Sequence, residues 1–119
     1  MNIEESLLLY AVTDRRWLRE GQSLSDVIKQ AVEGGATVIQ LREKELDREQ
    51  VIKEALDIKS YLNAKNIPLI IDNDIEVTKA AGADGVHVGQ DDCPVSEARK
   101  LLGKDFIIGA TAHNAAEAV

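Results

Sequence analysis

Three apolar runs in this chain each give way to polar and charged residues at their carboxyl end, as buried strands do when they end on one chemical face. With the polar residues that follow, the runs cover 38–44, 68–74 and 85–92. Segments with helical periodicity separate them, which is typical of βα units and a parallel sheet. Ligands bind at the carboxyl ends of such strands. We therefore expect six side chains to converge on one pocket: Gln40, Arg42, Lys44, Asp72, Asn73 and Asp92.

The rest of the sequence extends this α/β pattern. Ser23 is a suitable N-cap for a helix that ends at the following glycine pair, and Asp47 with Gln50 three residues later predicts a capping box for a longer helix. Further helices are expected at about 74–81, from near Pro94 to Gly103, and after Asn114. The five predicted strands are 7–12, 37–41, 68–71, 85–88 and 106–110.

Length limits how far this array can close. The 119 residues, with 45% apolar composition, allow one domain with an aliphatic core. An eight-unit βα barrel typically needs about 250 residues, and its smallest forms roughly 200. We therefore expect a single incomplete barrel domain over residues 1–119, with about five parallel strands.

Charge narrows the range of partners. A net charge of −7 disfavours nucleic acid and anionic membranes. The first residues contain no basic targeting region, and no apolar run approaches the roughly 20 residues needed to span a bilayer. We expect a cytoplasmic protein that binds small molecules.

The strongest motif is the run from Gln40 to Lys44. Side chains alternate along a strand, so Gln40, Arg42 and Lys44 are expected to share one face. An amide, a guanidinium and an ammonium together suit an extended oxyanion such as a diphosphate. The alternative is a strand that runs out into a solvated, charged loop. Acidic residues on the neighbouring strands favour a diphosphate bridged by Mg²⁺, which prefers few carboxylates and several phosphate or water oxygens.

The acidic residues have an alternative role as helix caps. Asp74 is well placed to cap the helix at 74–81, and Asp91 or Asp92 could cap the helix that begins near Pro94. Capping explains one acid at each place. It leaves Asp72 and one of the second pair available to a ligand.

Two histidines and a threonine complete the candidate pocket lining. His87 points the opposite way from the valines beside it, either into the barrel or beneath the helices, and a satisfied core histidine is the interpretation we favour. Thr111 and His113 follow the fifth strand on the ligand-bearing side. His113 has no evident partner, so the sequence supports no nucleophile of the Ser-His or Cys-His type.

Five collinear motifs together resemble the thiamine-phosphate synthase family, also called thiamine-phosphate pyrophosphorylase. They lie at 9–14, 34–36, 40–44, 83–92 and 108–114. The resemblance implies a barrel of the TIM type and a transferase of thiamine biosynthesis. Such an enzyme joins hydroxymethylpyrimidine diphosphate to thiazole phosphate and releases diphosphate with the help of Mg²⁺.

The resemblance also implies roles for particular residues. Gln40, Arg42 and Lys44 would bind the pyrimidine diphosphate. The other implied substrate contacts are Asp72 and Thr111, and the implied metal ligands are Asn73 and Asp92. The family commonly has Asn-Asp where this chain has Asp72-Asn73, so an amide stands at the metal position and metal binding is expected to weaken or move to Asp72. The family's phosphate-binding loops after strands six to eight have no counterpart here, so we expect the thiazole half of the site to be missing.

In this interpretation Arg42 and Lys44 stabilise charge on the departing diphosphate. One alternative is a thiazole tautomerase, which shares the barrel but lacks the metal-binding acids and relies on a histidine; Gln40 and Asp92 favour the synthase. Another is an inactive binding or assembly module. Because the fifth strand would have an open edge, we also expect a homo-oligomer.

Overall fold

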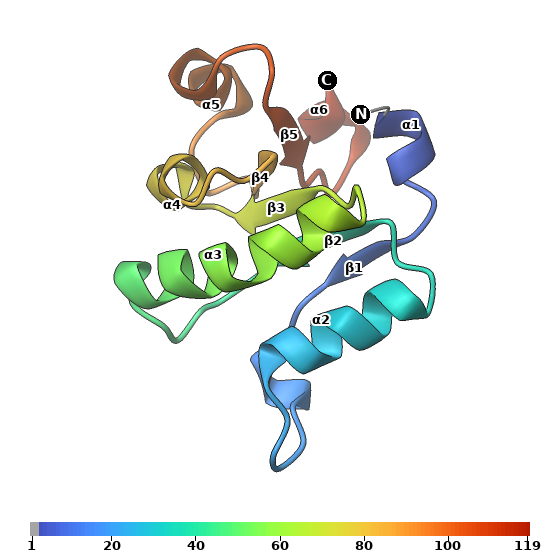
Figure 1. Cartoon of the computed structure of the whole chain (residues 1–119). Helices are drawn as coiled ribbons and strands as arrows, with labels where there is room; N and C mark the ends of the chain where they lie inside the picture. The colour runs from blue at the N-terminus through green and yellow to red at the C-terminus, as the bar shows by residue number, and fades with distance from the viewer. Residues whose placement is uncertain (1–2) are drawn as a thin grey trace.

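The computed structural model describes residues 3–119, apart from the side chains of residues 6 and 17. Five parallel strands form one sheet in the order β1-β2-β3-β4-β5, and helices connect them in sequence (Figure 1). The strands are β1 (Tyr10–Val12), β2 (Val38–Leu41), β3 (Leu69–Asp72), β4 (Gly85–Val88) and β5 (Ile107–Ala110). The expected α/β class, with the arrangement of a partial βα barrel, is confirmed.

The helices are α1 (Ile3–Ser6), α2 (Leu24–Glu33), α3 (Arg48–Ala64), α4 (Ile75–Ala80), α5 (Val95–Leu102) and α6 (Ala115–Ala118), with a 3₁₀ turn η1 (Arg15–Trp17) after β1. The predicted caps account for several of these boundaries. Ser23 and Asp47 both form capping boxes, and Asp74 and Asn114 each accept a hydrogen bond from the first turn of their helix.

Alternate strand residues point to opposite faces of the sheet, and the outer face carries the aliphatic core. Ile39 and Leu41 of β2 and Ile71 of β3 lie in a buried cluster with apolar residues of α2 and α3. Val86 and Val88 of β4 pack with Leu102 of α5 in a second cluster. The helices therefore cover the outer face, and the residues between these positions face inward.

Two glycines allow β4 and β5, with the His87 side chain, to approach each other closely on the inner face. A Cβ atom on Gly85 would lie 2.3 Å from the backbone oxygen of Ile107, and one on Gly109 would lie 2.6 Å from Nδ1 of His87. Neither position has room for a side chain. The close approach at Gly109 lets the His87 ring lie across β5.

The structure differs from the sequence-based prediction at the start of the chain and at the cap of α5. The first strand was predicted to begin at Leu7, but the amide of Leu7 bonds to the carbonyl of Ile3 and continues the turn of α1, which was not predicted. Neither Asp91 nor Asp92 caps α5, because Pro94 is the N-cap and no side chain caps this helix. Asp92 instead accepts a hydrogen bond from the Gly89 amide at 2.7 Å, which closes the turn after β4.

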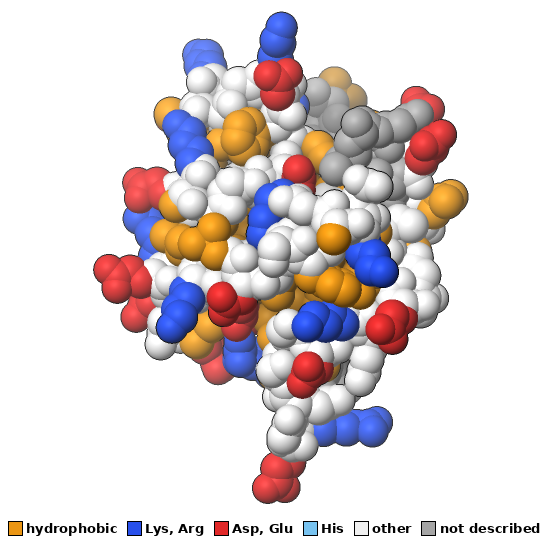
Figure 2. Space-filling view, in the orientation of Figure 1, with side chains coloured by type: hydrophobic (Ala, Val, Ile, Leu, Met, Phe, Trp, Pro, Cys, Tyr) orange, Lys and Arg blue, Asp and Glu red, His pale blue; other side chains and the backbone are white. Residues whose placement is uncertain are grey.

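Acidic and basic side chains are interspersed over the face that carries α2 and α3, without a continuous basic surface there (Figure 2). This distribution agrees with the net charge of −7 and gives no support to nucleic-acid binding on that face. Among the helices of residues 3–119, none combines the length and the apolar character required to cross a membrane.

Candidate functional site

A row of polar side chains crosses the inner face at the carboxyl ends of β2, β3 and β4. Gln40 pairs with Ile70, so Arg42, two residues further on, falls level with Asp72. Asp72 in turn pairs with His87. The Nε atom of Arg42 lies 3.9 Å from Oδ2 of Asp72, an ion pair without a short hydrogen bond. The sheet register thus brings together Arg42 and Asp72, which the sequence predicted for one pocket, and places beside them His87, which was predicted only as a possible lining residue.

Asp72 is the electrostatic centre of this row. Partial burial raises the pKa of its carboxyl group above the ordinary value, because the charged form loses solvation. Four surrounding ionisable groups also act on this pKa: Arg42, His87 and Lys44 lower it, and Asp92 raises it. Their influence shows that β2, β3 and β4 all deliver charged groups to the same small region.

His87 is held on this inner face by Thr111. Its Nε2 atom lies 2.8 Å from Oγ1 of Thr111, which follows β5. The side-chain amide of Gln90 donates a hydrogen bond to the carbonyl of the same threonine. His87 therefore lies inside the curve of the sheet rather than beneath the helices, and it is partly exposed beside Asp72.

The two predicted metal ligands lie at the ends of neighbouring strands. Asn73 has a left-handed backbone (φ 67°), and its backbone N–H donates a hydrogen bond to the backbone carbonyl of His87 at 2.7 Å. Its side chain is exposed, and Asp92 is partly buried. Within residues 3–119 no group of three or more His, Cys, Asp and Glu side chains is arranged to hold a metal ion.

Gln40 differs from its predicted neighbours because it is buried, with 4% of its surface exposed. Its Nε2 atom donates to the hydroxyl oxygen of Tyr10 at 3.0 Å. Burial raises the pKa of the Tyr10 hydroxyl above its ordinary value. Tyr10 was not predicted from the sequence as a site residue. It lies two residues before Val12, which pairs with Gln40, so its side chain is on the same inner face of the sheet.

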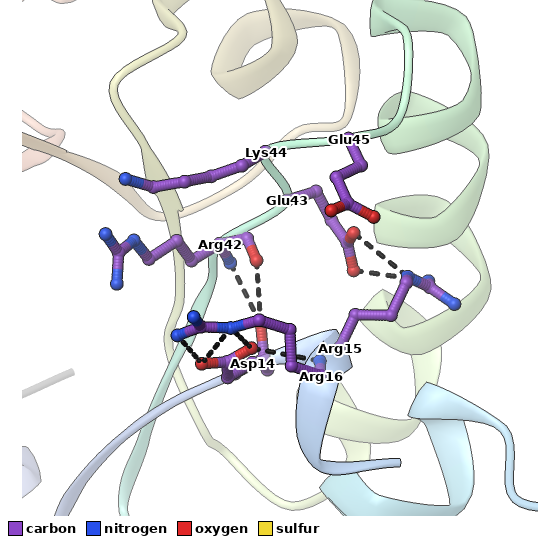
Figure 3. A pocket seen from close by; sticks show the side chains of 8 residues that line it. Asp14, Arg15, Arg16, Arg42, Glu43, Lys44 and Glu45 are labelled. Atoms are coloured by element: carbon purple, nitrogen blue, oxygen red, sulfur yellow. Dashed lines mark hydrogen bonds and ion pairs between the residues drawn. The ribbon is translucent and has the colours of Figure 1, made fainter.

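A pocket of about 320 Å³ opens between the loops that follow β1 and β2 (Figure 3). Arg42 and Lys44 extend to one side of it, whereas Glu43 and Glu45 point the other way. This alternation agrees with the predicted shared face of Arg42 and Lys44. The lining residues are Thr13, Asp14, Arg15, Arg16, Arg42, Glu43, Lys44 and Glu45.

Thr13 fixes the backbone of Arg42. The Arg42 amide donates to Oγ1 of Thr13 at 2.9 Å, and that hydroxyl lies 3.5 Å from the carbonyl of Arg42. Nearby, Arg16 pairs with Asp14 at 2.7 Å. The loop after β1 therefore supports the start of the loop after β2.

Arg15 joins three elements. It donates to both carboxylate oxygens of Glu43, at 3.1 and 3.2 Å, and also pairs with Glu54 of α3. The Glu43 side chain is only 1% exposed. Sequence reasoning missed this cluster, although the run 13–16 follows the first strand at its carboxyl end, where functional residues were expected.

His113 follows β5 and pairs within its own segment. Its Nδ1 atom is 2.9 Å from Oε1 of Glu117 in α6, and its ring is largely exposed. The partner that the sequence did not reveal is thus a residue four positions further along.

Comparisons with known proteins agree with this architecture. The family model described as thiamine monophosphate synthase matches residues 9–119. Thiamine-phosphate synthase of Clostridium acetobutylicum is 48% identical over 93% of this chain and 52% of its own length. The chloroplastic thiamine biosynthetic bifunctional enzyme TH1 of Arabidopsis thaliana is 45% identical over 90% of the chain and 21% of its own length.

A solved structure leads to the same family. Thiamine phosphate pyrophosphorylase from Pyrococcus furiosus superimposes with a TM-score of 0.89 at 31% identity, over 98% of this chain and 55% of that one. The fold and the site together define an α/β protein of the βα-barrel class, with five parallel strands and polar residues at their carboxyl ends. The chain belongs to the thiamine monophosphate synthase family. It spans about half the length of the thiamine-phosphate synthases it matches.

Proposed function

We propose that this chain provides the pyrimidine-diphosphate side of a thiamine-phosphate synthase site. The observation that carries the proposal is the row of Arg42, Asp72 and His87 at the carboxyl ends of three adjacent strands. Lys44 extends to the same side as Arg42. Two cations on one side of a pocket suit a diphosphate, because charge-assisted hydrogen bonds to phosphate oxygens are strong.

The proposed reaction joins hydroxymethylpyrimidine diphosphate to thiazole phosphate. The bond between the pyrimidine methylene carbon and the diphosphate oxygen breaks, and its electron pair leaves with the diphosphate. The thiazole nitrogen donates its lone pair to the methylene carbon and forms the new bond. Arg42 and Lys44 stabilise the charge that builds on the departing diphosphate. No proton moves in these bond changes, so the proposed reaction needs no general base.

The remaining residues are proposed to position the substrate. Gln40, held by Tyr10, presents its amide beside the inner face. Asp72 and Thr111 are proposed as further substrate contacts, and His87 lies between them as a lining residue. His113 lines the outer limit of the site in this proposal, where Glu117 holds its ring.

The donor chemistry fits Mg²⁺. Asn73 and Asp92 would hold it through amide and carboxylate oxygens, with Asp72 as a further carboxylate nearby. Hard cations prefer such oxygens, and Mg²⁺ commonly completes its shell with phosphate and water. When bound, Mg²⁺ would neutralise negative charge on the diphosphate.

The whole reaction is proposed for the complete site of the family. We propose that residues 1–119 form one incomplete barrel domain, which carries the pyrimidine-diphosphate half of the site and lacks the thiazole-phosphate half. A cytoplasmic location and assembly into a homo-oligomer belong to the same proposal. The alternatives, a tautomerase or an inactive assembly module, predict no magnesium-dependent binding of diphosphate.

Isothermal titration calorimetry with diphosphate, with and without Mg²⁺, tests this proposal. We expect weak binding by the parent chain that Arg42→Ala reduces by about tenfold to a hundredfold, as for the loss of one charge-assisted partner. Arg19→Ala is the control, because it removes the same charge from an exposed loop residue outside the pocket. Equal affinities for the Arg42 and Arg19 variants would contradict the proposal.

A further inference from the structure

The loop after β2 carries the two cations of the proposed anion site but has no regular secondary structure between β2 and α3. Arg15, Arg16, Arg42 and Lys44 all line the pocket beside it. A loop without helix or strand hydrogen bonds needs other contacts to hold Arg42 and Lys44 in place.

Those contacts come from the loop after β1. Thr13 holds the backbone of Arg42, and Arg15 holds the side chain of the next residue, Glu43, through a two-point contact. Glu43 points to one side of the loop, and its two sequence neighbours, Arg42 and Lys44, extend to the other (Figure 3). Fixing the Glu43 side chain therefore restricts the directions open to both cations. Arg15 thus acts on the cations without touching their side of the pocket.

Glu54 gives the Arg15 side chain a second carboxylate partner. It brings α3 onto the same guanidinium group, so that one arginine joins η1, the loop after β2 and α3. Its Oε1 atom is buried and has no hydrogen-bond partner within the described part of the chain. Burial and the neighbouring Glu43 favour a proton on Glu54, which would turn this oxygen into a donor. Only the planar, forked guanidinium of arginine provides several fixed donors to two carboxyl groups at once.

We propose that Arg15 is a positioning residue for the diphosphate site: it anchors Glu43 and Glu54 and thereby fixes the direction of Arg42 and Lys44. The inference rests on the proposed function for the identity of the ligand. It assigns a role to a residue that contacts neither the substrate nor the metal.

Arg15→Lys is the decisive variant, because it keeps the positive charge and removes the forked geometry. Arg99→Lys is the matched control. Arg99 donates to the carbonyls of Gly103 and Phe106 at the opposite end of the sheet, so this substitution also removes arginine hydrogen bonds and leaves the site intact. Both variants are compared with the parent by urea unfolding, by calorimetry with diphosphate and Mg²⁺, and by ¹⁵N relaxation of the Arg42 and Lys44 backbone amides.

We expect Arg15→Lys to weaken diphosphate binding about tenfold and to increase the motion of both amides, whereas Arg99→Lys changes stability alone. Unchanged affinity and unchanged amide motion in Arg15→Lys would overturn the proposal, as would equal effects from Arg99→Lys. If the parent chain binds no diphosphate, the proposed function fails, and the relaxation data still decide whether Arg15 orders the loop. If Arg15→Lys does not fold, Glu43→Gln replaces it, with relaxation as its readout and increased amide motion as the expected result.

Discussion

The His87 ring of β4 lies across β5: its Nε2 atom lies 2.8 Å from the Thr111 hydroxyl, and its Nδ1 atom lies 2.6 Å from the position that a Cβ atom on Gly109 would take. The ring therefore fills the inner face that Gly109 leaves open. Its position explains both the contact with Thr111 and the placement of an imidazole next to Asp72.

Gly109→Ala should destabilise the fold, because the new methyl group would lie 2.6 Å from His87. We expect a loss of about 1–3 kcal/mol in the free energy of unfolding, measured in urea. In a His87→Ala background the same change should cost little, because the obstructing ring is gone. If Gly109→Ala lowers the free energy of unfolding by the same amount in that background, the methyl group does not clash with the His87 ring.

The carboxyl group of Glu54 should make stability depend on pH. Burial, followed by the neighbouring Glu43, raises its pKa from 4.5 to about 7. The folded state then holds a proton that the unfolded state releases between these values, so stability is present at low pH and is lost as the pH rises through this range. Relative to Glu54→Gln, the parent should lose of order 1–2 kcal/mol between about pH 5 and about pH 8, after allowance for solvent screening. Urea unfolding at both pH values measures this, and parallel curves for the two proteins would refute it.

Asn73→Asp should strengthen the magnesium-dependent part of diphosphate binding, because it adds a carboxylate at the proposed metal position. Asn66→Asp is the control: both asparagines have a left-handed backbone, with φ of 67° and 58°, and Asn66 lies at the far end of α3. Calorimetry at several Mg²⁺ concentrations should show tighter binding for Asn73→Asp alone. Equal affinities for the parent and Asn73→Asp would mean that Asp72 already serves as the ligand or that no metal binds here.

The 119-residue polypeptide assayed by itself should form no measurable thiamine phosphate. Coupling requires both substrates to be held in reacting geometry, and without a thiazole-phosphate site the gain in effective molarity is lost. The assay follows thiamine phosphate formation from both substrates in the presence of Mg²⁺. Robust turnover by the purified chain would show that these residues bind both substrates.

The same polypeptide should self-associate. β1 and β5 are the edge strands of the sheet, and apolar residues in and just before β1 are exposed, Val12 by 49% and Leu8 by 81%. Open edges and apolar surface favour pairing with another chain. Sedimentation velocity at micromolar concentration should show a species larger than the monomer; a single monomeric boundary would contradict this.

The sequence predicted the sheet and its ligand-bearing end because buried parallel strands carry a strong local signal. Arg42 and Asp72 could be placed at one end from their positions at or just after the ends of apolar runs. The direction of His87 could not be decided in this way, because it depends on a contact with Thr111 of the next strand-and-loop segment. The cluster of Arg15, Glu43 and Glu54 could not be predicted. Glu43 and Glu54 lie 28 and 39 positions after Arg15 in the sequence, and their contacts with it depend on how the loop after β1 packs against α3. The hydrogen bond of the Gln40 side chain was equally hidden, because its partner is the Tyr10 hydroxyl on the neighbouring strand.

Strand order also bears on how the chain is made. Each strand pairs only with its neighbours in sequence, from Tyr10 with Val38 to Gly85 with Ile107. A polypeptide that emerges from the ribosome amino end first therefore presents every new strand to a partner that has already been synthesised. The shortest step, from Ile70 to Gly85, closes a loop with little loss of chain entropy. The order of translation is thus also an order in which the sheet can be assembled.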